Sequence, residues 1–132
     1  MAYTIELPGV FDERGNLRWV ESGIIVPFEI KRVFYMTDVP PQGISRGGHA
    51  HRKCHQFIIL ASGGMNVDLD YDGQRNTAIY LRSPNVGFHV PPLVWCTLTL
   101  YPSTVCIVLA SELYDENDYI RDYSTFLEEV KK

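Results

Sequence analysis

The sequence has no long apolar run, no excess of positive charge and no region of biased composition. Its 132 residues carry 12 Lys and Arg against 16 Asp and Glu, a formal net charge of -4. Binding to a nucleic-acid backbone generally needs a concentrated basic surface, and a helix that spans a bilayer needs about 20 consecutive apolar residues. We therefore expect neither a nucleic-acid nor a membrane partner, and a few local arginines have to meet any bound phosphate.

The chain also lacks the signs of export. Residues 1–16 contain no basic segment followed by an apolar run, which a secretory signal would need. The three cysteines, Cys54, Cys96 and Cys106, form no Cys-x-x-Cys pair, and this suits a reducing compartment better than a disulfide scaffold. The sequence therefore predicts a cytoplasmic protein, and its length predicts a single domain over residues 1–132.

Short β-type runs separated by turn residues dominate the chain. Within residues 65–71 apolar and polar side chains alternate, as in a strand with one buried face, and Asp72-Gly73 is a strong hairpin signal. Many short strands at this spacing predict an all-β sandwich or barrel. The expected strands are 17–21, 29–37, 47–51, 56–62, 64–71, 75–81, 87–90, 95–100 and 104–110.

The C-terminal segment has a different pattern. Between residues 115 and 132 the apolar side chains fall at helical spacing, with acidic residues early and two lysines at the end, an order that the helix dipole favours. We expect a short helix there that closes the barrel.

The most informative stretch is residues 43–63, which contains His49-Ala50-His51. Residues two apart in a strand point to the same side, so both imidazoles are expected to enter one cavity while Ala50 faces away. A pair of histidines in a cavity either binds a metal or transfers protons near neutral pH.

The spacing of this stretch resembles the first cupin motif, and it implies an RmlC-like double-stranded β-helix, or jelly-roll barrel. Gly43, His49, His51 and Gly63 match that motif, whereas Gln56 stands in place of the usual glutamate. Cys96 occupies the last ligand position of the second cupin motif. A neutral amide is a weaker ligand than a carboxylate, so we expect no metal and no cofactor. A zinc site of His49, His51 and Cys96 remains the alternative.

The whole chain resembles the sugar-nucleotide 3,4-ketoisomerases, cupin enzymes that act on dTDP-4-keto-6-deoxyglucose in deoxysugar biosynthesis. The resemblance rests mainly on Arg-Gly-x-His-Ala-His at residues 46–51 and Asp-Tyr-Ile-Arg-Asp-Tyr at residues 118–123, with further matches at residues 12–17, 25–35 and 109–123. It implies a metal-independent isomerase, typically a homodimer, whose partner is a dTDP-linked keto-deoxysugar. Phe34 departs from the pattern, since the family often carries tyrosine there.

The reaction that the resemblance implies moves a proton from C3 of a 4-keto sugar to C4 through an enediol. A neutral imidazole suits this work because its pKa lies near the working pH. We assign the proton transfers to His49 and His51, with Tyr35 as hydrogen-bonding partner or acid. The sequence leaves open which histidine takes the proton from carbon.

Substrate contacts are expected from arginines and one amide. A guanidinium matches phosphate oxygens and stays charged at any relevant pH, which makes arginines near the histidines good diphosphate ligands. The expected substrate-binding residues are Arg14, Arg32, Arg46, Gln56 and Arg121.

Three other functions stay open on the sequence. The first is a related epimerase on the same class of substrate, and the second is a metal-dependent cupin enzyme that uses His49, His51 and Cys96. The third is a non-catalytic sugar-nucleotide binding protein, which the departures at Phe34 and Cys96 would explain.

Overall fold

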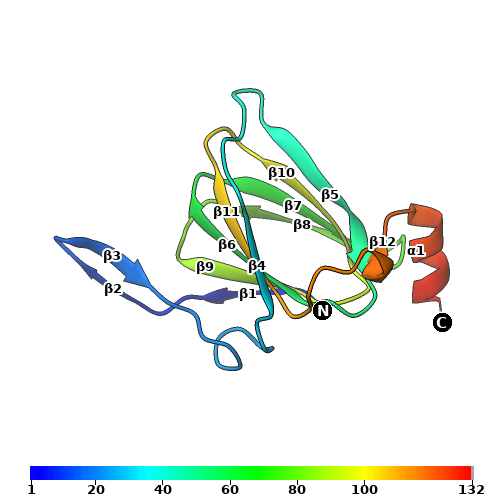
Figure 1. The fold of residues 1–132 in the computed structure, drawn as a ribbon. Helices are drawn as coiled ribbons and strands as arrows, with labels where there is room; N and C mark the ends of the chain where they lie inside the picture. The colour runs from blue at the N-terminus through cyan, green and yellow to red at the C-terminus, as the bar shows by residue number, and fades with distance from the viewer. Residues whose placement is uncertain (132) are drawn as a thin grey trace.

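The computed structural model describes residues 1–131, and it is built around two antiparallel β-sheets that face each other (Figure 1). One sheet has the strand order β1-β9-β6-β11-β4 and the other β12-β5-β10-β7-β8. The strands are β1 (Tyr3–Glu6), β2 (Gly9–Asp12), β3 (Gly15–Arg18), β4 (Arg32–Met36), β5 (Ile44–His51), β6 (Gln56–Ser62), β7 (Met65–Asp70), β8 (Asn76–Leu81), β9 (Val86–Val90), β10 (Trp95–Leu100), β11 (Val105–Ala110) and β12 (Tyr119–Ile120). The expected all-β barrel is confirmed.

Alternate side chains of the strands fill the space between the two sheets. Ile58, Met65, Phe88 and Leu100 are almost completely buried in this main core. Because side chains alternate across each strand, their neighbours in sequence face outward, and Phe57 belongs to a second buried cluster on the outer surface of the first sheet.

The hairpin of β2 and β3 extends away from the barrel (Figure 1). Strand β3 begins and ends earlier than the predicted strand 17–21, and strands β1, β2 and β12 were not expected.

The hairpin exposes apolar side chains, with Phe11 55% and Leu17 61% exposed. An isolated two-stranded hairpin is marginal in water, and much of the apolar surface of this hairpin is uncovered within the chain.

The C-terminal helix is shorter than predicted. A 3-10 turn, η1 (Glu116–Asp118), and strand β12 precede helix α1 (Tyr123–Val130). The helix starts where the carboxylate of Asp122 accepts a hydrogen bond from the backbone N–H of Thr125, an ordinary N-cap. Residues 115–122 are not α-helical because Tyr119 and Ile120 pair with strand β5 instead.

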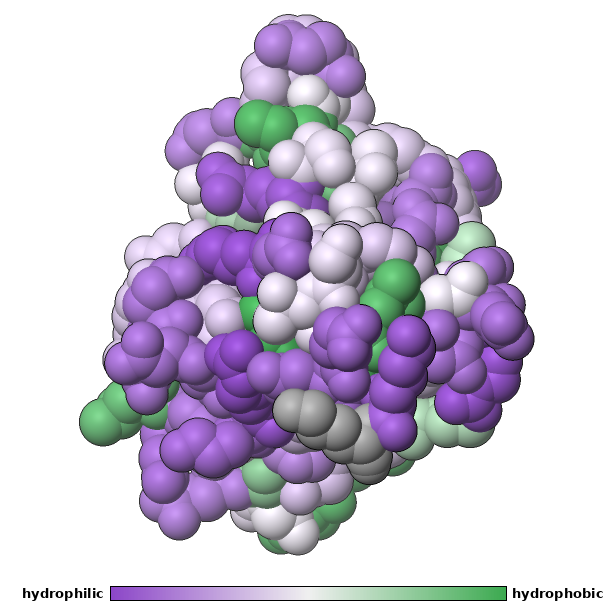
Figure 2. All heavy atoms as spheres, turned by 90° about the vertical axis from the view of Figure 1, so that its right-hand side faces the viewer, coloured by the Kyte–Doolittle hydropathy of each residue, from purple (hydrophilic) through white to green (hydrophobic). Residues whose placement is uncertain are grey.

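Helix α1 covers the outer side of strand β5. Phe126 is fully buried in a cluster with Ala50 and Ile120, so Ala50 faces away from the barrel interior as predicted. The surface around α1 is mostly hydrophilic with isolated hydrophobic side chains (Figure 2). Within residues 1–131, no helix has the length and hydropathy that a membrane crossing requires.

Candidate active site

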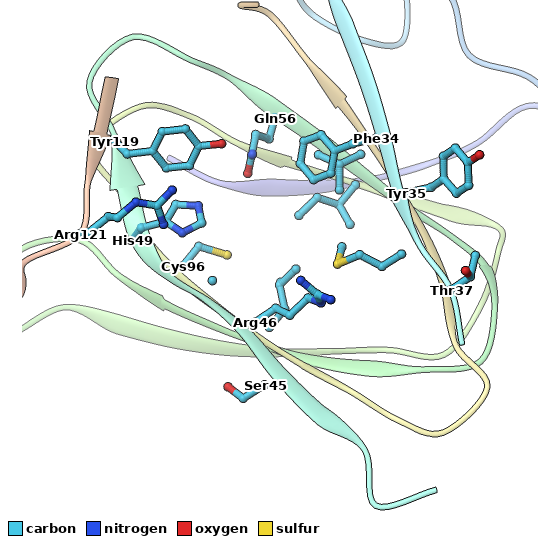
Figure 3. Close-up of a pocket in the computed structure, with 15 residues that line it drawn as sticks. Phe34, Tyr35, Thr37, Ser45, Arg46, His49, Gln56, Cys96, Tyr119 and Arg121 are labelled. Carbon is cyan, nitrogen blue, oxygen red and sulfur yellow. The ribbon is translucent and has the colours of Figure 1, made fainter. Parts of the chain in front are cut away.

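The barrel contains a cavity of about 700 Å³ between the two sheets, within the usual size range of small-molecule sites. Aliphatic and aromatic side chains from strands β4, β6 and β11 form part of its wall. The side chains that offer chemistry there are Arg46, His49, Gln56, Cys96, Tyr119 and Arg121 (Figure 3).

A β-bulge in strand β5 aims the site residues. Strand pairing shifts between Cys96 opposite His49 and Thr97 opposite Gly47, so one extra residue, Gly48, is inserted. Both glycines have positive φ, 89° at Gly47 and 74° at Gly48, which other residues rarely adopt. Without the bulge Arg46 and His49 would face opposite sides of the strand, since they are three positions apart. The bulge places both in the cavity.

His49 is the histidine that lines the cavity. Burial lowers its pKa to about 4, with further lowering by the nearby charges of His51 and Arg121. Its ring is therefore neutral near pH 7 and carries a lone pair that can accept a proton. The Nδ1 atom is buried and has no hydrogen-bond partner among the described residues.

His51 lies behind His49, with ring centroids 5.0 Å apart and the rings nearly perpendicular. Its Nδ1 is 3.2 Å from the carboxylate of Asp118, which also accepts hydrogen bonds from the backbone N–H groups of Lys53 and Cys54 at 2.7 and 3.2 Å. This carboxylate holds the proton on Nδ1 and leaves Nε2 as an acceptor. Burial lowers the pKa of His51, and Asp118 partly opposes that effect.

Tyr119 packs against both histidines. Its ring centroid is 5.0 Å from that of His49 and 4.3 Å from that of His51. Arg121 lies over the Tyr119 ring, with its guanidinium carbon 4.3 Å from the centroid, and is bound to Glu116 at 2.6 and 3.0 Å. The Arg121 and Tyr114 hydrogen bonds lower the pKa of Glu116 to about 2, so the ion pair persists across the physiological range.

The other predicted site residues divide into two groups. Arg46 and Gln56 reach the cavity (Figure 3). Tyr35 stands at its rim, 70% exposed, and its hydroxyl points away from the histidines. Arg32 packs over the rings of Phe34 and Tyr114 outside the cavity lining, and Arg14 lies at the tip of the β2–β3 hairpin, paired with Asp12 at 2.7 Å. Within this chain, neither of these two arginines meets the cavity.

The strand register explains the position of Tyr35. In strand β4 the side chains alternate, and Phe34 is the one that enters the cavity. Position 34, where the resemblance led us to expect a tyrosine, therefore places a phenyl ring without a hydroxyl in the cavity.

The metal alternative has little support from the side-chain arrangement. Among the described residues, the group whose ligand atoms converge is His51, Cys54 and Asp118, not His49, His51 and Cys96. Burial also raises the pKa of Cys96 to about 12, which keeps it as a thiol, a much poorer ligand than a thiolate. All three cysteines are free and buried.

Sequence reasoning missed Asp118, Tyr119 and Glu116 as parts of the site. Asp118 and Tyr119 belong to the quoted tail motif, but the helical spacing of residues 115–132 drew them into an expected helix. A local signal did exist, because Asp122 three residues before Thr125 is an N-cap pattern that starts the helix later.

Fold and site together define a small cupin barrel whose interior holds a neutral histidine next to a carboxylate-bound histidine. The family model FdtA, described as "WxcM-like, C-terminal", matches residues 2–131. The chain belongs to this family.

The relatives agree with this family. The TDP-4-oxo-6-deoxy-alpha-D-glucose-3,4-oxoisomerase of Aneurinibacillus thermoaerophilus is 41% identical over 129 residues, which cover 97% of this chain and 91% of the relative. A mutant of the 3,4-ketoisomerase QdtA from Thermoanaerobacterium thermosaccharolyticum, solved with TDP-4-keto-6-deoxyglucose, has a TM-score of 0.90 and 38% identity, covering 98% and 94% of the two chains. A 3,4-ketoisomerase from Helicobacter canadensis has a TM-score of 0.92 and 35% identity, covering 99% and 98%. The resemblance drawn from the sequence, and the cupin fold that it implied, are confirmed.

Proposed function

We propose that this chain is an isomerase that converts a dTDP-linked 4-keto-6-deoxyhexose to its 3-keto isomer in deoxysugar biosynthesis. The observation that carries the proposal is His49, a neutral imidazole in a cavity large enough for a hexose. The relatives support the substrate class, since one is named for this reaction and another was solved with TDP-4-keto-6-deoxyglucose.

In the proposed reaction His49 removes the C3 proton, which the neighbouring C4 carbonyl makes acidic. The electron pair of the C3–H bond becomes the double bond of an enediol, and a proton then returns to C4 from the His49 imidazolium. Carbon 3 is oxidised and carbon 4 is reduced within one molecule, so the balance needs no external oxidant or reductant. The ring of His51, which Asp118 holds in place, packs against the ring of His49 and so orients it. The same ring provides a polar neighbour on one side of His49.

We assign substrate binding first to Arg46 and Gln56, which share the cavity with His49. Arg46 has no ion-pair partner among the described residues and is the diphosphate ligand in this proposal. Gln56 donates to and accepts from sugar hydroxyls. Arg121 is held by Glu116 and forms the wall of the site, and Arg32 acts through the packing of Phe34.

We further propose a cytoplasmic homodimer. Exposed apolar side chains on the β2–β3 hairpin and on the outer face of β4, such as Phe11, Leu17 and Val33, need a covering surface. Arg14 contributes to substrate binding in this arrangement only if the hairpin of one copy lies against the barrel of the other. Light scattering on the purified protein is expected to give twice the monomer mass, and a monomer would contradict the dimer.

The function is tested by running the reaction in heavy water and following C3 and C4 of the sugar by NMR. With TDP-4-keto-6-deoxyglucose, the protein is expected to form a 3-keto product, seen by NMR. Its C4 carries deuterium in the fraction of turnovers in which the His49 imidazolium exchanges with the heavy water before it returns the proton. The variant His49→Asn is expected to show no product. The matched control is His55→Asn, which lies on the outer face of the first sheet and outside the cavity. Deuterium next to the ketone without movement of the carbonyl would indicate an epimerase, and thermal stabilisation by dTDP without turnover would indicate a binding protein.

A further inference from the structure

The isomerisation moves a second proton that the histidines do not account for. When a 4-keto sugar becomes a 3-keto sugar, the oxygen on C4 gains a proton and the oxygen on C3 loses one. The two oxygens are neighbours on the ring, so one hydroxyl placed against both can serve each of them in turn. This step rests on the proposed function.

Strand β4 does not supply such a hydroxyl. Phe34 occupies the inward position and has no polar atom, and the hydroxyl of Tyr35 points away from the cavity at a side chain that is 70% exposed (Figure 3). The hydroxyl of Tyr35, the residue that the sequence assigned to this role, therefore lies at the rim of the cavity and points away from His49.

Strand β12 supplies one instead. Tyr119 lines the cavity, and its hydroxyl points into it (Figure 3). Within residues 1–131 no group forms a hydrogen bond with that hydroxyl, in contrast to Tyr101, Tyr114 and Tyr123, whose hydroxyls bind Asn66, Glu116 and Asp70. A phenol that is free in this way can both donate and accept a proton.

The ring of Tyr119 is held in place from two sides. His51 packs on it with a centroid distance of 4.3 Å, and the Arg121 guanidinium lies 4.3 Å from the ring centroid, with its position set by Glu116. The backbone is also held, since Tyr119 pairs with His51 across β12 and β5 and its carbonyl accepts a hydrogen bond from Arg52 at 3.2 Å. The hydroxyl therefore stays near His49, where the sugar must lie.

We propose that Tyr119 is a catalytic residue that carries a proton from the C3 oxygen to the C4 oxygen. As His49 takes the C3 hydrogen, the C3–H electron pair forms the C3–C4 double bond, and the C4 carbonyl pair bonds to the proton that Tyr119 gives. The resulting phenolate then takes the proton of the C3 hydroxyl. That O–H pair becomes the C3 carbonyl, and the double-bond pair takes the proton that returns from His49 to C4. Tyr119 and His49 both end in their starting states.

The central variant is Tyr119→Phe, which keeps the ring and its packing and removes only the hydroxyl. We expect kcat to fall about 100- to 1000-fold, the usual size of a general acid–base contribution, while KM and the melting temperature stay within about twofold and a few degrees. Tyr80→Phe, on the outer edge of β8, is the matched control and is expected to keep full kcat.

A second variant separates a chemical role from a structural one. Phe34 faces the same cavity, so Phe34→Tyr in the Tyr119→Phe background restores a hydroxyl there and is expected to recover at least about tenfold in kcat. No recovery together with a lowered melting temperature in Tyr119→Phe would show a packing role and overturn the proposal.

The outcomes also separate this inference from the proposed function. If wild type turns over and His49→Asn does not, but Tyr119→Phe has wild-type kcat, only the role of Tyr119 is wrong. If Tyr35→Phe shows the large loss instead, the hydroxyl comes from β4 and the proposal is again overturned. If wild type gives no isomerised product, the proposed function itself is wrong.

Discussion

The protein has two pairs of histidines on opposite sides of its barrel wall, and only one pair is placed for chemistry. His49 and His51 lie within the barrel, with a buried ring nitrogen on each that has no partner among the described residues. His55 and His89 lie on the outer side of the first sheet, where Nδ1 of His55 is 3.0 Å from Nε2 of His89. The outer rings are nearly coplanar, at 16°, and this contact satisfies one nitrogen of each ring. Nδ1 of His89 is also buried without a partner among the described residues, but it does not line the cavity. The comparison shows that available nitrogens beside an open volume, not the presence of two imidazoles, indicate a proton-transfer site.

The largest expected contrast is in catalysis. His49→Asn removes the proposed base and is expected to lower kcat/KM at least about 1000-fold. His89→Asn breaks the outer pair and is expected to change kcat/KM by less than about threefold, because no atom of His89 reaches the cavity. Steady-state assays of both variants with TDP-4-keto-6-deoxyglucose measure the contrast, and equal losses would remove the distinction between the pairs.

A smaller effect is expected from the carboxylate behind the inner pair. Asp118→Asn keeps the size and the backbone hydrogen bond from Lys53. Its N–H group replaces the oxygen that both faces Nδ1 of His51 and accepts a hydrogen bond from the backbone N–H of Cys54. His51 then has to carry its proton on Nε2, the wrong tautomer for its position beside His49. We expect kcat to fall about 10- to 100-fold with little change in KM, measured by initial rates. Wild-type kcat with an unchanged melting temperature would exclude a positioning role for Asp118.

The outer pair is expected to affect stability instead. Burial, and then the charge of His55, lower the pKa of His89 to about 4 in the folded state, whereas an unfolded histidine titrates near 6.5. Below about pH 6.5 the unfolded chain therefore binds more protons, so folding becomes weaker as the pH falls toward 4 and is unaffected above 6.5.

The variant His89→Gln isolates this effect because it keeps a polar group near His55 that does not titrate. Between pH 7 and pH 5 the wild type is expected to lose about 2 kcal/mol of unfolding free energy more than the variant does. Urea unfolding at the two pH values gives the difference. Parallel losses in both proteins would show that His89 is not the titrating group.

The smallest effect is expected in the pH dependence of catalysis. The pKa of His49 is about 4, so the base is already neutral well below pH 7, and kcat/KM is expected to change less than about twofold between pH 5.5 and 7.5. An ordinary histidine would give a clear decline below about pH 6.5. A profile of kcat/KM against pH between 5.5 and 7.5 decides whether the base has a lowered pKa or the pKa of an ordinary histidine.

Much of the fold was predictable from the sequence because its signals are local. The alternation in residues 65–71, the Asp72-Gly73 turn and the His-x-His spacing depend on backbone geometry that each segment carries by itself. The all-β class, most inner strands and the direction of Ala50 were therefore correct. The late start of helix α1 was missed because pairing of β12 with the distant strand β5 overrode the local helical spacing. The first hairpin was missed although its two strands pair only with each other.

The amino-acid sequence by itself determined the family, the barrel and the residue types that handle protons and phosphate. Only the tertiary structure decided which of those residues meet. The bulge at Gly47 and Gly48 brings Arg46 and His49 into one cavity, and the register of β4 turns Phe34 inward and Tyr35 outward. The pairing of β12 with β5 brings Tyr119 to the histidines, together with Asp118, which is 67 residues from His51 in the sequence. Such contacts depend on strand register, in which a shift of one residue reverses every side chain, and register is set by the packing of the whole barrel.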